Sequence, residues 1–311
     1  MNNFLKSIAV ASAIVLAATG AASAADRIIM VTHGQANDAF WNVVKNGAAE
    51  AAKETGVEFD YRAPETFDMV AMGQLIDAAV NQQPAGLVVT IPDADALGPS
   101  IQRATAAGIP VITINSGSDV SKKLGALLHV GQDEYSAGKI AGAKLKEMGG
   151  KKAICINHEV GNVALDIRCK GFADGFGGLV SVLPTTNDFT EVKSKVRAAL
   201  DADKAIDTVM ALSAGQAGEP AVAAVQEAGK GSTVRVASFD LSANFLKLIA
   251  DGKAVFAVDQ QQYLQGYLPV IFLANYVKYG LIPAGNVPSG PNLVTKDKAA
   301  KVIALSAEGV R

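Results

Sequence analysis

The stretch Ile28 to Trp41 has the sequence IIMVTHGQANDAFW, and it sets the pattern for the whole chain. An apolar run turns polar and then leads into an alanine-rich amphipathic segment, which predicts a buried parallel strand, a loop and a helix. In open α/β sheets, ligands bind at this edge, where helix N-termini offer unsatisfied N–H groups. Here Phe40 and Trp41 share the loop with Asp38, and such residues suit the apolar face and the hydroxyls of a sugar ring. Alternatively, the two aromatic side chains only cover the base of the helix.

The same alternation of strand and helix continues along the chain. Strands are expected at residues 28–32, 58–61, 86–90, 111–114, 127–130, 152–157, 179–183, 208–212, 235–239 and 254–258. Helices are expected at residues 41–55, 69–81, 94–106, 136–148, 163–176, 191–201, 220–228, 244–251 and 264–279. This alternation specifies parallel sheets covered by helices on both faces, and the length suits two domains. The sequence therefore predicts an α/β fold with two doubly wound lobes.

The late part of the chain indicates how the two lobes are connected. The polar segment QQQYLQ at 260–265 precedes a long apolar helix that has no strand beside it in sequence. A chain that crosses back to the first lobe would explain this helix. We expect crossings near residues 130–133, 259–261 and 287–290. The predicted N-terminal lobe comprises residues 25–130 and 260–287, and the predicted C-terminal lobe comprises residues 131–259 and 288–311.

Residues 1–24 have the features of a cleavable secretion signal. Lys6 gives a positive start, an apolar core follows at 8–18, and Ala22-Ser23-Ala24 is a small-residue cleavage motif. The apolar core is short for a membrane span, and no cysteine at the cleavage site suggests a lipid anchor. We therefore expect an exported, periplasmic protein whose mature chain begins at Ala25.

Composition argues against several classes of protein. The chain has 28 Lys and Arg against 30 Asp and Glu, which leaves neither a nucleic-acid footprint nor a polybasic membrane patch. Its three histidines are scattered, and it has no P-loop, no G-x-S-x-G elbow and no metal-ligand spacing, so we expect neither catalysis nor a cofactor. Nothing indicates oligomerisation, and we expect a monomer. Cys155 in a predicted strand and Cys169 on the next helix leave a disulfide open in an oxidising compartment.

Seven short landmarks follow one another along the chain. They are DAFW at 38–41, AGIPVITIN at 107–115, RCKGF at 168–172, DF at 188–189, VQEAGK at 225–230, SFD at 238–240 and DQ at 259–260. In this order and spacing the chain resembles the periplasmic sugar-binding proteins of the ribose and galactose type, the soluble receptors of carbohydrate ABC importers. The resemblance covers essentially all of the mature sequence. It implies a three-segment hinge, a cleft that closes on a small neutral sugar or polyol, and delivery to the membrane subunits of a permease.

The resemblance also implies a set of ligand-binding residues. They are Asp38, Phe40, Trp41, Asn115, Ser116, Arg168, Phe189, Ser213, Asp240 and Gln260. A guanidinium together with carboxylates gives charge-assisted hydrogen bonds, and these reject analogues that lack a hydroxyl. Ser116 stands where ribose-type members have an arginine, which argues against a ribose-like ligand, and the loop after Ser213 is longer than in those members. His33 and Asn162 are expected to be neighbours of the site.

Each of these residues also has a purely structural interpretation. Arg168 would then form an ion pair on a helix surface, Phe189 would belong to the core, and Asp240 would cap the helix near Ser242. Asn115 would be only a turn former, as would Ser116, and Gln260 a surface amide.

Other functions on the same fold stay open at this stage. The ligand is alternatively an inositol derivative, an amino sugar or a furanone signal, because Asp38 and Asp240 are also suited to pair with an amine. A chemoreceptor would be a further partner. A DNA-binding repressor core shares the fold, but it carries a basic headpiece where this chain has its predicted secretion signal.

Overall fold

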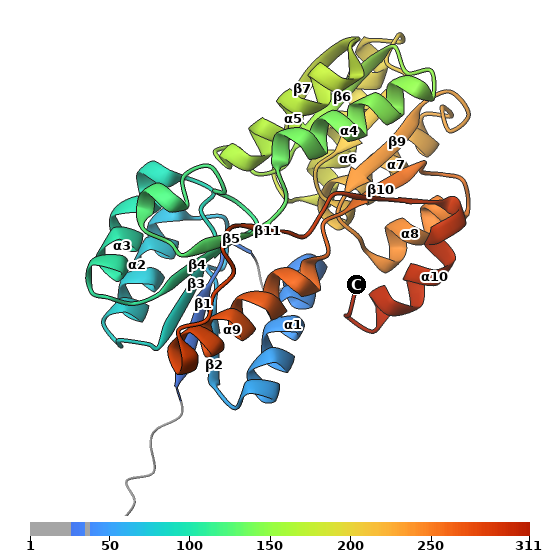
Figure 1. The fold of residues 1–311 in the computed structure, drawn as a ribbon. Coiled ribbons are helices and arrows are strands. Elements are labelled where there is room, and N and C mark those ends of the chain that lie inside the picture. Colours follow the sequence, from blue (N-terminus) through green and yellow to red (C-terminus); the bar gives the residue numbers. More distant parts are fainter. Residues whose placement is uncertain (1–25, 35–37) are drawn as a thin grey trace, which may run out of the picture.

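The computed structural model describes residues 26–34 and 38–311, which form two α/β lobes (Figure 1). The predicted secretion signal and Ala25 lie outside the described residues. The first sheet contains, from edge to edge, β11 (Val287–Pro288), β5 (Leu128–Gly131), β4 (Val111–Ile114), β3 (Gly86–Val89), β1 (Arg27–Val31) and β2 (Glu58–Arg62). The second contains β12 (Asn292–Thr295), β10 (Phe256–Asp259), β9 (Arg235–Phe239), β8 (Thr208–Ala211), β6 (Lys152–Asn157) and β7 (Leu179–Pro184). The predicted fold class is confirmed.

Helices cover both faces of each sheet. In the first lobe, one face carries α1 (Ala39–Thr55) and α9 (Gln262–Tyr279), and the other carries α2 (Met69–Val80) and α3 (Ala94–Ala106). In the second lobe, α4 (Glu134–Glu147) and α5 (Val163–Phe176) lie on one face, and the other carries α6 (Phe189–Ala202), α7 (Glu219–Glu227), α8 (Ala243–Ala250) and α10 (Lys296–Ala307). The inner strands are therefore buried on both sides, which explains their apolar sequences.

Three elements near the loops and the C-terminus are not predicted by the sequence pattern. Strand β12 pairs antiparallel with β10, whereas the other strand pairs of both sheets are parallel. Helix α10 has a weak apolar stripe, since Ala299 and Val302 are its buried positions. A π-helical turn, η2 (Ala214–Gly218), lies in the loop after β8.

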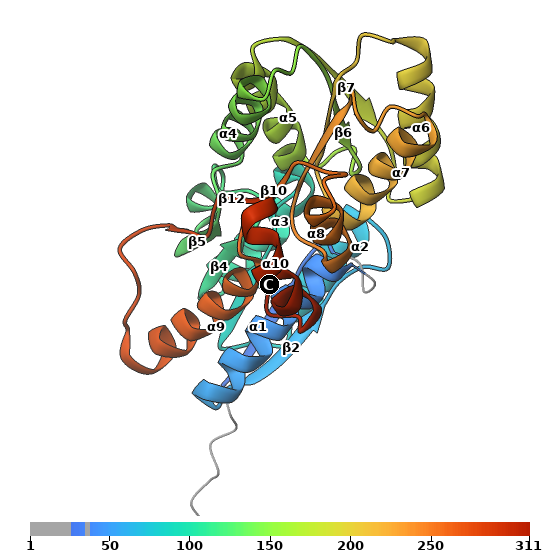
Figure 2. The same cartoon turned by 90° about the vertical axis from the view of Figure 1, so that its right-hand side faces the viewer.

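The chain passes between the two sheets at residues 132–133, 260–261 and 289–291 (Figures 1 and 2). Hydrogen bonds join these segments to one another. The Ser289 N–H donates to the Gly131 carbonyl at 2.7 Å, and Gln261 Nε2 donates to the Ser289 carbonyl at 2.7 Å. The crossings therefore form one strip between the lobes. Within the described part of the chain, no helix has the length and apolar character needed to cross a membrane.

Each lobe contains one helix pair whose backbones approach closely at a glycine. An added Cβ at Gly138 of α4 would overlap the carbonyl oxygen of Arg168 on α5, and one at Gly266 of α9 would overlap the carbonyl oxygen of Val44 on α1. A residue without a side chain is needed at both places. These contacts hold α1 and α5 in place, the two helices that face the opposite lobe.

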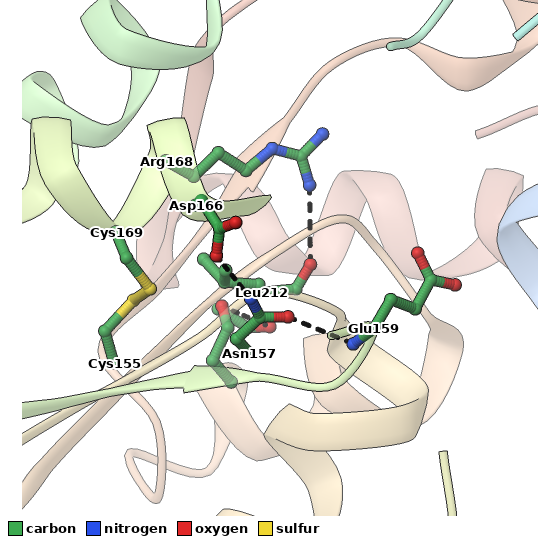
Figure 3. Close-up of a disulfide and its surroundings, with 9 residues drawn as sticks. Cys155, Asn157, Glu159, Asp166, Arg168, Cys169 and Leu212 are labelled. Carbon is green, nitrogen blue, oxygen red and sulfur yellow. Dashed lines mark hydrogen bonds between the residues drawn. A yellow bond between two sulfur atoms is a disulfide. The ribbon is translucent and has the colours of Figure 1, made fainter. Parts of the chain in front are cut away.

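A disulfide adds a second constraint on α5. Cys155 of β6 and Cys169 of α5 are joined, with their Cα atoms 5.9 Å apart, and both are buried. Figure 3 shows the bridge next to Arg168. Nearby, Asn157 Nδ2 donates a hydrogen bond of 2.9 Å to Asp166, which lies on the same helix (Figure 3). The strand and the helix are therefore tied together at two points.

The close approach of α4 and α5 can be tested by substitution. We expect Gly138→Val to lower the free energy of unfolding of the second lobe by about 1–3 kcal/mol, because the added side chain overpacks the interface. Urea unfolding followed by circular dichroism measures this change. Gly285→Val is the control, since an added Cβ there meets no atom within 4 Å. Equal unfolding midpoints for the two variants would contradict the close packing.

Candidate ligand-binding site between the lobes

A small cavity of about 30 Å³ lies between the lobes, where the carboxyl ends of both sheets face each other. We call it the central cavity. Eight of the ten predicted ligand-binding residues line it: Asp38, Phe40, Trp41, Asn115, Arg168, Ser213, Asp240 and Gln260. His33 and Asn162, which were expected to be neighbours, line it as well. The structure therefore brings together residues that are up to 227 positions apart, from His33 to Gln260.

Two predicted residues lie apart from the central cavity. Ser116 is fully buried, and its Oγ has no hydrogen-bond partner among the described residues. Phe189 is the first residue of α6 and is 47% exposed, so it is not part of the core either. Neither side chain reaches the other eight, and neither enters the proposal made below.

Asn115 and Asp240 follow equivalent strands, β4 and β9, and both have left-handed backbones, with φ of 61° and 67°. This conformation is costly for a residue with a side chain, although Asn and Asp tolerate it best. Gln260 joins them across the lobes. Its Nε2 donates to Asp240 Oδ1 at 2.6 Å, and its Oε1 accepts from Asn115 Nδ2 at 3.3 Å. Asp240 is therefore not a helix cap; Ser242 caps α8 instead.

Arg168 is 3% exposed and held from three sides, so the interpretation as a surface ion pair is wrong. Its Nε and Nη2 donate to the two carboxylate oxygens of Glu134 on α4, the second at 3.1 Å. Its Nη1 donates to the Leu212 carbonyl at 3.5 Å, and the guanidinium lies 4.8 Å from the centre of the Phe239 ring. The sequence analysis missed Glu134. The signal that it overlooked is a carboxylate directly after the first predicted crossing.

The carboxyl groups of Glu134, Glu159 and Asp240 lie near this single guanidinium, and Asp38 lines the same cavity. Burial raises the pKa of Glu134, although the bond to Arg168 opposes the shift. Burial also raises the pKa of Asp38 to about 6, and that of Glu159 and of Asp240 to about 7. The cavity is therefore richer in hydrogen-bond acceptors than in donors. Glu159 was also missed, because it lies in the loop after β6, where no landmark points to it.

Two histidines occupy equivalent positions in the two lobes, His33 in the loop after β1 and His158 in the loop after β6. Burial and the nearby positive charge of Arg168 lower the pKa of each to about 3, so both are neutral near pH 7. His33 Nδ1 lies 2.8 Å from Thr90 Oγ1, and its Nε2 lies 3.7 Å from a carboxylate oxygen of Glu159 in the other lobe. The two rings therefore add polar edges to the cavity without adding charge.

The sequence left open whether Phe40 and Trp41 line a binding site or only cover the base of the helix, and the structure shows both. Phe40 and Trp41 belong to the core of the first lobe, and both also line the central cavity. Trp41 is 5% exposed and meets the His33 ring edge to face, with 4.8 Å between the ring centres. The aromatic wall is therefore rigid.

The two lobes touch across the cleft. Gln216 Nε2 donates to Asp38 Oδ2 at 3.1 Å, and the Val163 N–H donates to the Pro92 carbonyl at 3.0 Å. Asp38 also caps α1 through its other oxygen, which accepts from the Phe40 N–H at 2.9 Å. The site residues are therefore enclosed by both lobes in this structure. Among residues 26–34 and 38–311, no group of three or more His, Cys, Asp and Glu is arranged to hold a metal ion.

A family model described as a periplasmic binding protein domain matches residues 28–281. The chain belongs to the periplasmic binding protein family. Its lobes, crossings and interlobe cavity are those of a two-lobed solute receptor, and the recognition made from the landmarks is confirmed.

Individual relatives agree with this assignment. The chain is 36% identical to a carbohydrate transporter from Acidothermus cellulolyticus 11B, solved in complex with myo-inositol; the match covers 92% of this chain and 99% of that one, with a TM-score of 0.87. It is 28% identical to a periplasmic sugar-binding protein from Legionella pneumophila, over 85% and 99% of the chains, with a TM-score of 0.80. It is also 28% identical to the ribose import binding protein RbsB of Salmonella typhimurium, over 83% of this chain and 88% of that protein.

The raised carboxyl pKa values predict how stability depends on pH. The pKa of Asp240 is about 7 in the folded protein against an ordinary value of 3.8, so the folded state binds more protons between these values. The contribution of Asp240 to the free energy of unfolding should therefore fall as the pH rises from 4 to 8, by up to about 1.4 kcal/mol for each unit of pKa difference. The lowered pKa values of His33 and His158 act in the opposite direction below pH 6.5, so the test compares the wild type with a variant of Asp240 alone. Urea titrations of the wild type and Asp240→Asn at pH 5 and pH 8 measure this. The variant should lose part of the dependence; an unchanged dependence would contradict the shift.

Proposed function

We propose that this chain is an extracytoplasmic receptor that binds a small neutral sugar or polyol between its lobes and presents it to an ABC permease. The observation that carries the proposal is the buried cluster in which Arg168 and carboxyl groups from both lobes meet an aromatic wall. The similarity to a carbohydrate transporter in complex with myo-inositol supports a single-ring ligand. Binding rather than catalysis fits the relatives, which are binding and transport proteins by name.

The proposed binding chemistry follows from the positions of the polar groups. Asp38 and Asp240 accept hydrogen bonds from hydroxyls, one from each lobe, while Arg168 and Asn115 donate to ring or hydroxyl oxygens. Phe40 and Trp41 offer an apolar wall to the C–H face of the ring. A hydrogen bond to a charged group contributes about 1.5–3 kcal/mol, so a few of them, with the aromatic contact, support micromolar or tighter binding after the costs of association.

The proposed mechanism is closure of the two lobes about the three crossings. A ligand shifts the balance between open and closed lobes only as far as it binds the closed form better. A ring that touches Asp38 in one lobe and Asp240 in the other binds the closed form better, because opening the cleft removes one set of contacts. Periplasmic binding proteins are a standard example of such hinge closure. The closed surface would then be the form that the permease recognises.

An isosteric change at Asp240 tests the site. We expect Asp240→Asn to weaken ligand binding by about 10- to 100-fold, since it replaces a charged acceptor and keeps its shape. Isothermal titration calorimetry with myo-inositol, pentoses, hexoses and amino sugars gives the affinity and names the ligand class. Asp251→Asn is the matched control, because this exposed aspartate lies in the same lobe outside the cavity. Unchanged affinity in Asp240→Asn would remove this residue from the site, and no binding across the panel would reject the sugar receptor.

The single tryptophan reports on the same site. We expect the fluorescence of Trp41 to change on saturation with the ligand found in that panel, because the indole lines the central cavity. The change should disappear in Trp41→Phe, which keeps an aromatic wall and removes the fluorophore. A spectrum that does not respond to saturating ligand would show that the ring binds away from Trp41.

A further inference from the structure

A second and larger cavity adjoins the central one. Its volume is about 510 Å³, and we call it the outer cavity. Four residues line both cavities: Asp38, Phe40, Ser213 and Asp240. Two of these are the carboxyl groups that are proposed to hold the ring. The two cavities therefore lie side by side at the residues that would hold the ring.

The walls of the outer cavity come from both lobes. The start of α1 contributes Asn42, the start of α8 contributes Asn244, and the end of α10 contributes Ser306 and Gly309. A hydrogen bond between the lobes holds the chain at the C-terminal end of α10 in place, since Asn46 Nδ2 on α1 donates to the Gly309 carbonyl at 3.0 Å. The cavity is therefore built by the closed arrangement of the lobes, as the central cavity is.

The lining of the outer cavity mixes apolar and polar side chains, and it is acidic and free of basic side chains. It contains the carboxyl groups of Asp38, Glu219 and Asp240, whereas no Lys, Arg or His lines it in the described residues. Carboxyl and amide oxygens accept hydrogen bonds from hydroxyls. Hydroxyl groups therefore fit this lining, and a phosphate or carboxylate is repelled.

We propose that the outer cavity is a subsite for a second, uncharged glycosyl unit attached to the ring that binds among the residues of the central cavity, which must widen from about 30 Å³ to admit that ring. This inference rests on the proposed function, which supplies the first ring. The junction lies at the shared residues Asp38 and Asp240, and the second unit extends toward α8 and the end of α10. The carboxyl group of Glu219, which lines the outer cavity, accepts a hydrogen bond from one of its hydroxyls. The preferred ligand is then a glycoside of the size of a disaccharide, and phosphorylated rings are rejected.

Paired ligands test the inference on the full mature chain by isothermal titration calorimetry. The pairs are myo-inositol with α-galactosyl-myo-inositol, D-glucose with maltose, and D-galactose with lactose, and myo-inositol 1-phosphate is the anionic probe. In the pair that binds, we expect the glycosylated member to bind at least tenfold more tightly than the ring alone. We expect myo-inositol 1-phosphate to bind at least tenfold more weakly than myo-inositol.

A variant that fills only the outer cavity distinguishes the contributions of the two cavities to binding. Gly215 lines only the outer one, and an added Cβ there meets a single atom, Glu219 Oε1, at 4.0 Å. Gly215→Leu should weaken binding of the glycoside at least tenfold and leave binding of the ring within twofold. Gly285→Leu is the control, at a glycine with open space around an added Cβ outside both cavities.

The outcomes distinguish this inference from the proposed function. A ring that binds as tightly as its glycoside, or a glycoside that Gly215→Leu does not affect, would overturn the outer subsite while the receptor for a single ring stands. A protein that binds no member of any pair would overturn both. Loss of ring and glycoside together in Gly215→Leu, with an unchanged melting temperature, would also overturn the subsite, because the two cavities would then act as one.

Discussion

A guanidinium buried between two lobes is the constraint on which the rest of this structure depends. Arg168 is paired with Glu134, and removing either partner would leave an uncompensated charge in the interior, which is far more costly than the pair is worth as a source of stability. The pair therefore needs α4 and α5 to stay in register. Three features hold them there: the close approach at Gly138, the bond between Asn157 and Asp166, and the Cys155–Cys169 disulfide. Much of the second lobe serves to keep one side chain in place.

The site is assembled from equivalent places in two similar sheets. His33 and His158 follow the corresponding strands β1 and β6, and Asn115 and Asp240 follow β4 and β9. Because the carboxyl ends of both sheets face the same cleft, the loops of the two lobes meet there. The polar groups at these loops are nevertheless unlike, and most of the acid comes from the second lobe and its crossing. The two walls of the cleft therefore differ in charge.

The sequence was sufficient for the fold class and for eight residues of the central cavity, because periodic apolar runs and strand-end landmarks are local signals. It did not reveal site residues whose main contact is with a residue far away in the sequence. Glu134 lies 34 positions from Arg168, and its place after the first crossing does not identify its partner. Helix α10 was missed because its apolar stripe is weak, and β12 because Val294 is its one buried residue. Phe189 does not line the central cavity for a related reason: the landmark located its helix, but only the packing of the loops decides where the ring points.

The left-handed residues at the two strand ends have a consequence for evolution and engineering. Asn115 and Asp240 hold a backbone conformation that costs on the order of 1–2 kcal/mol for a residue with a side chain. Glycine would relieve that strain at either place, and it would also delete the polar groups that meet through Gln260. Screens for thermostability alone would favour such changes and would select proteins that survive heating but no longer recognise their ligand. At these two positions, a change that raises thermal stability is expected to weaken ligand binding.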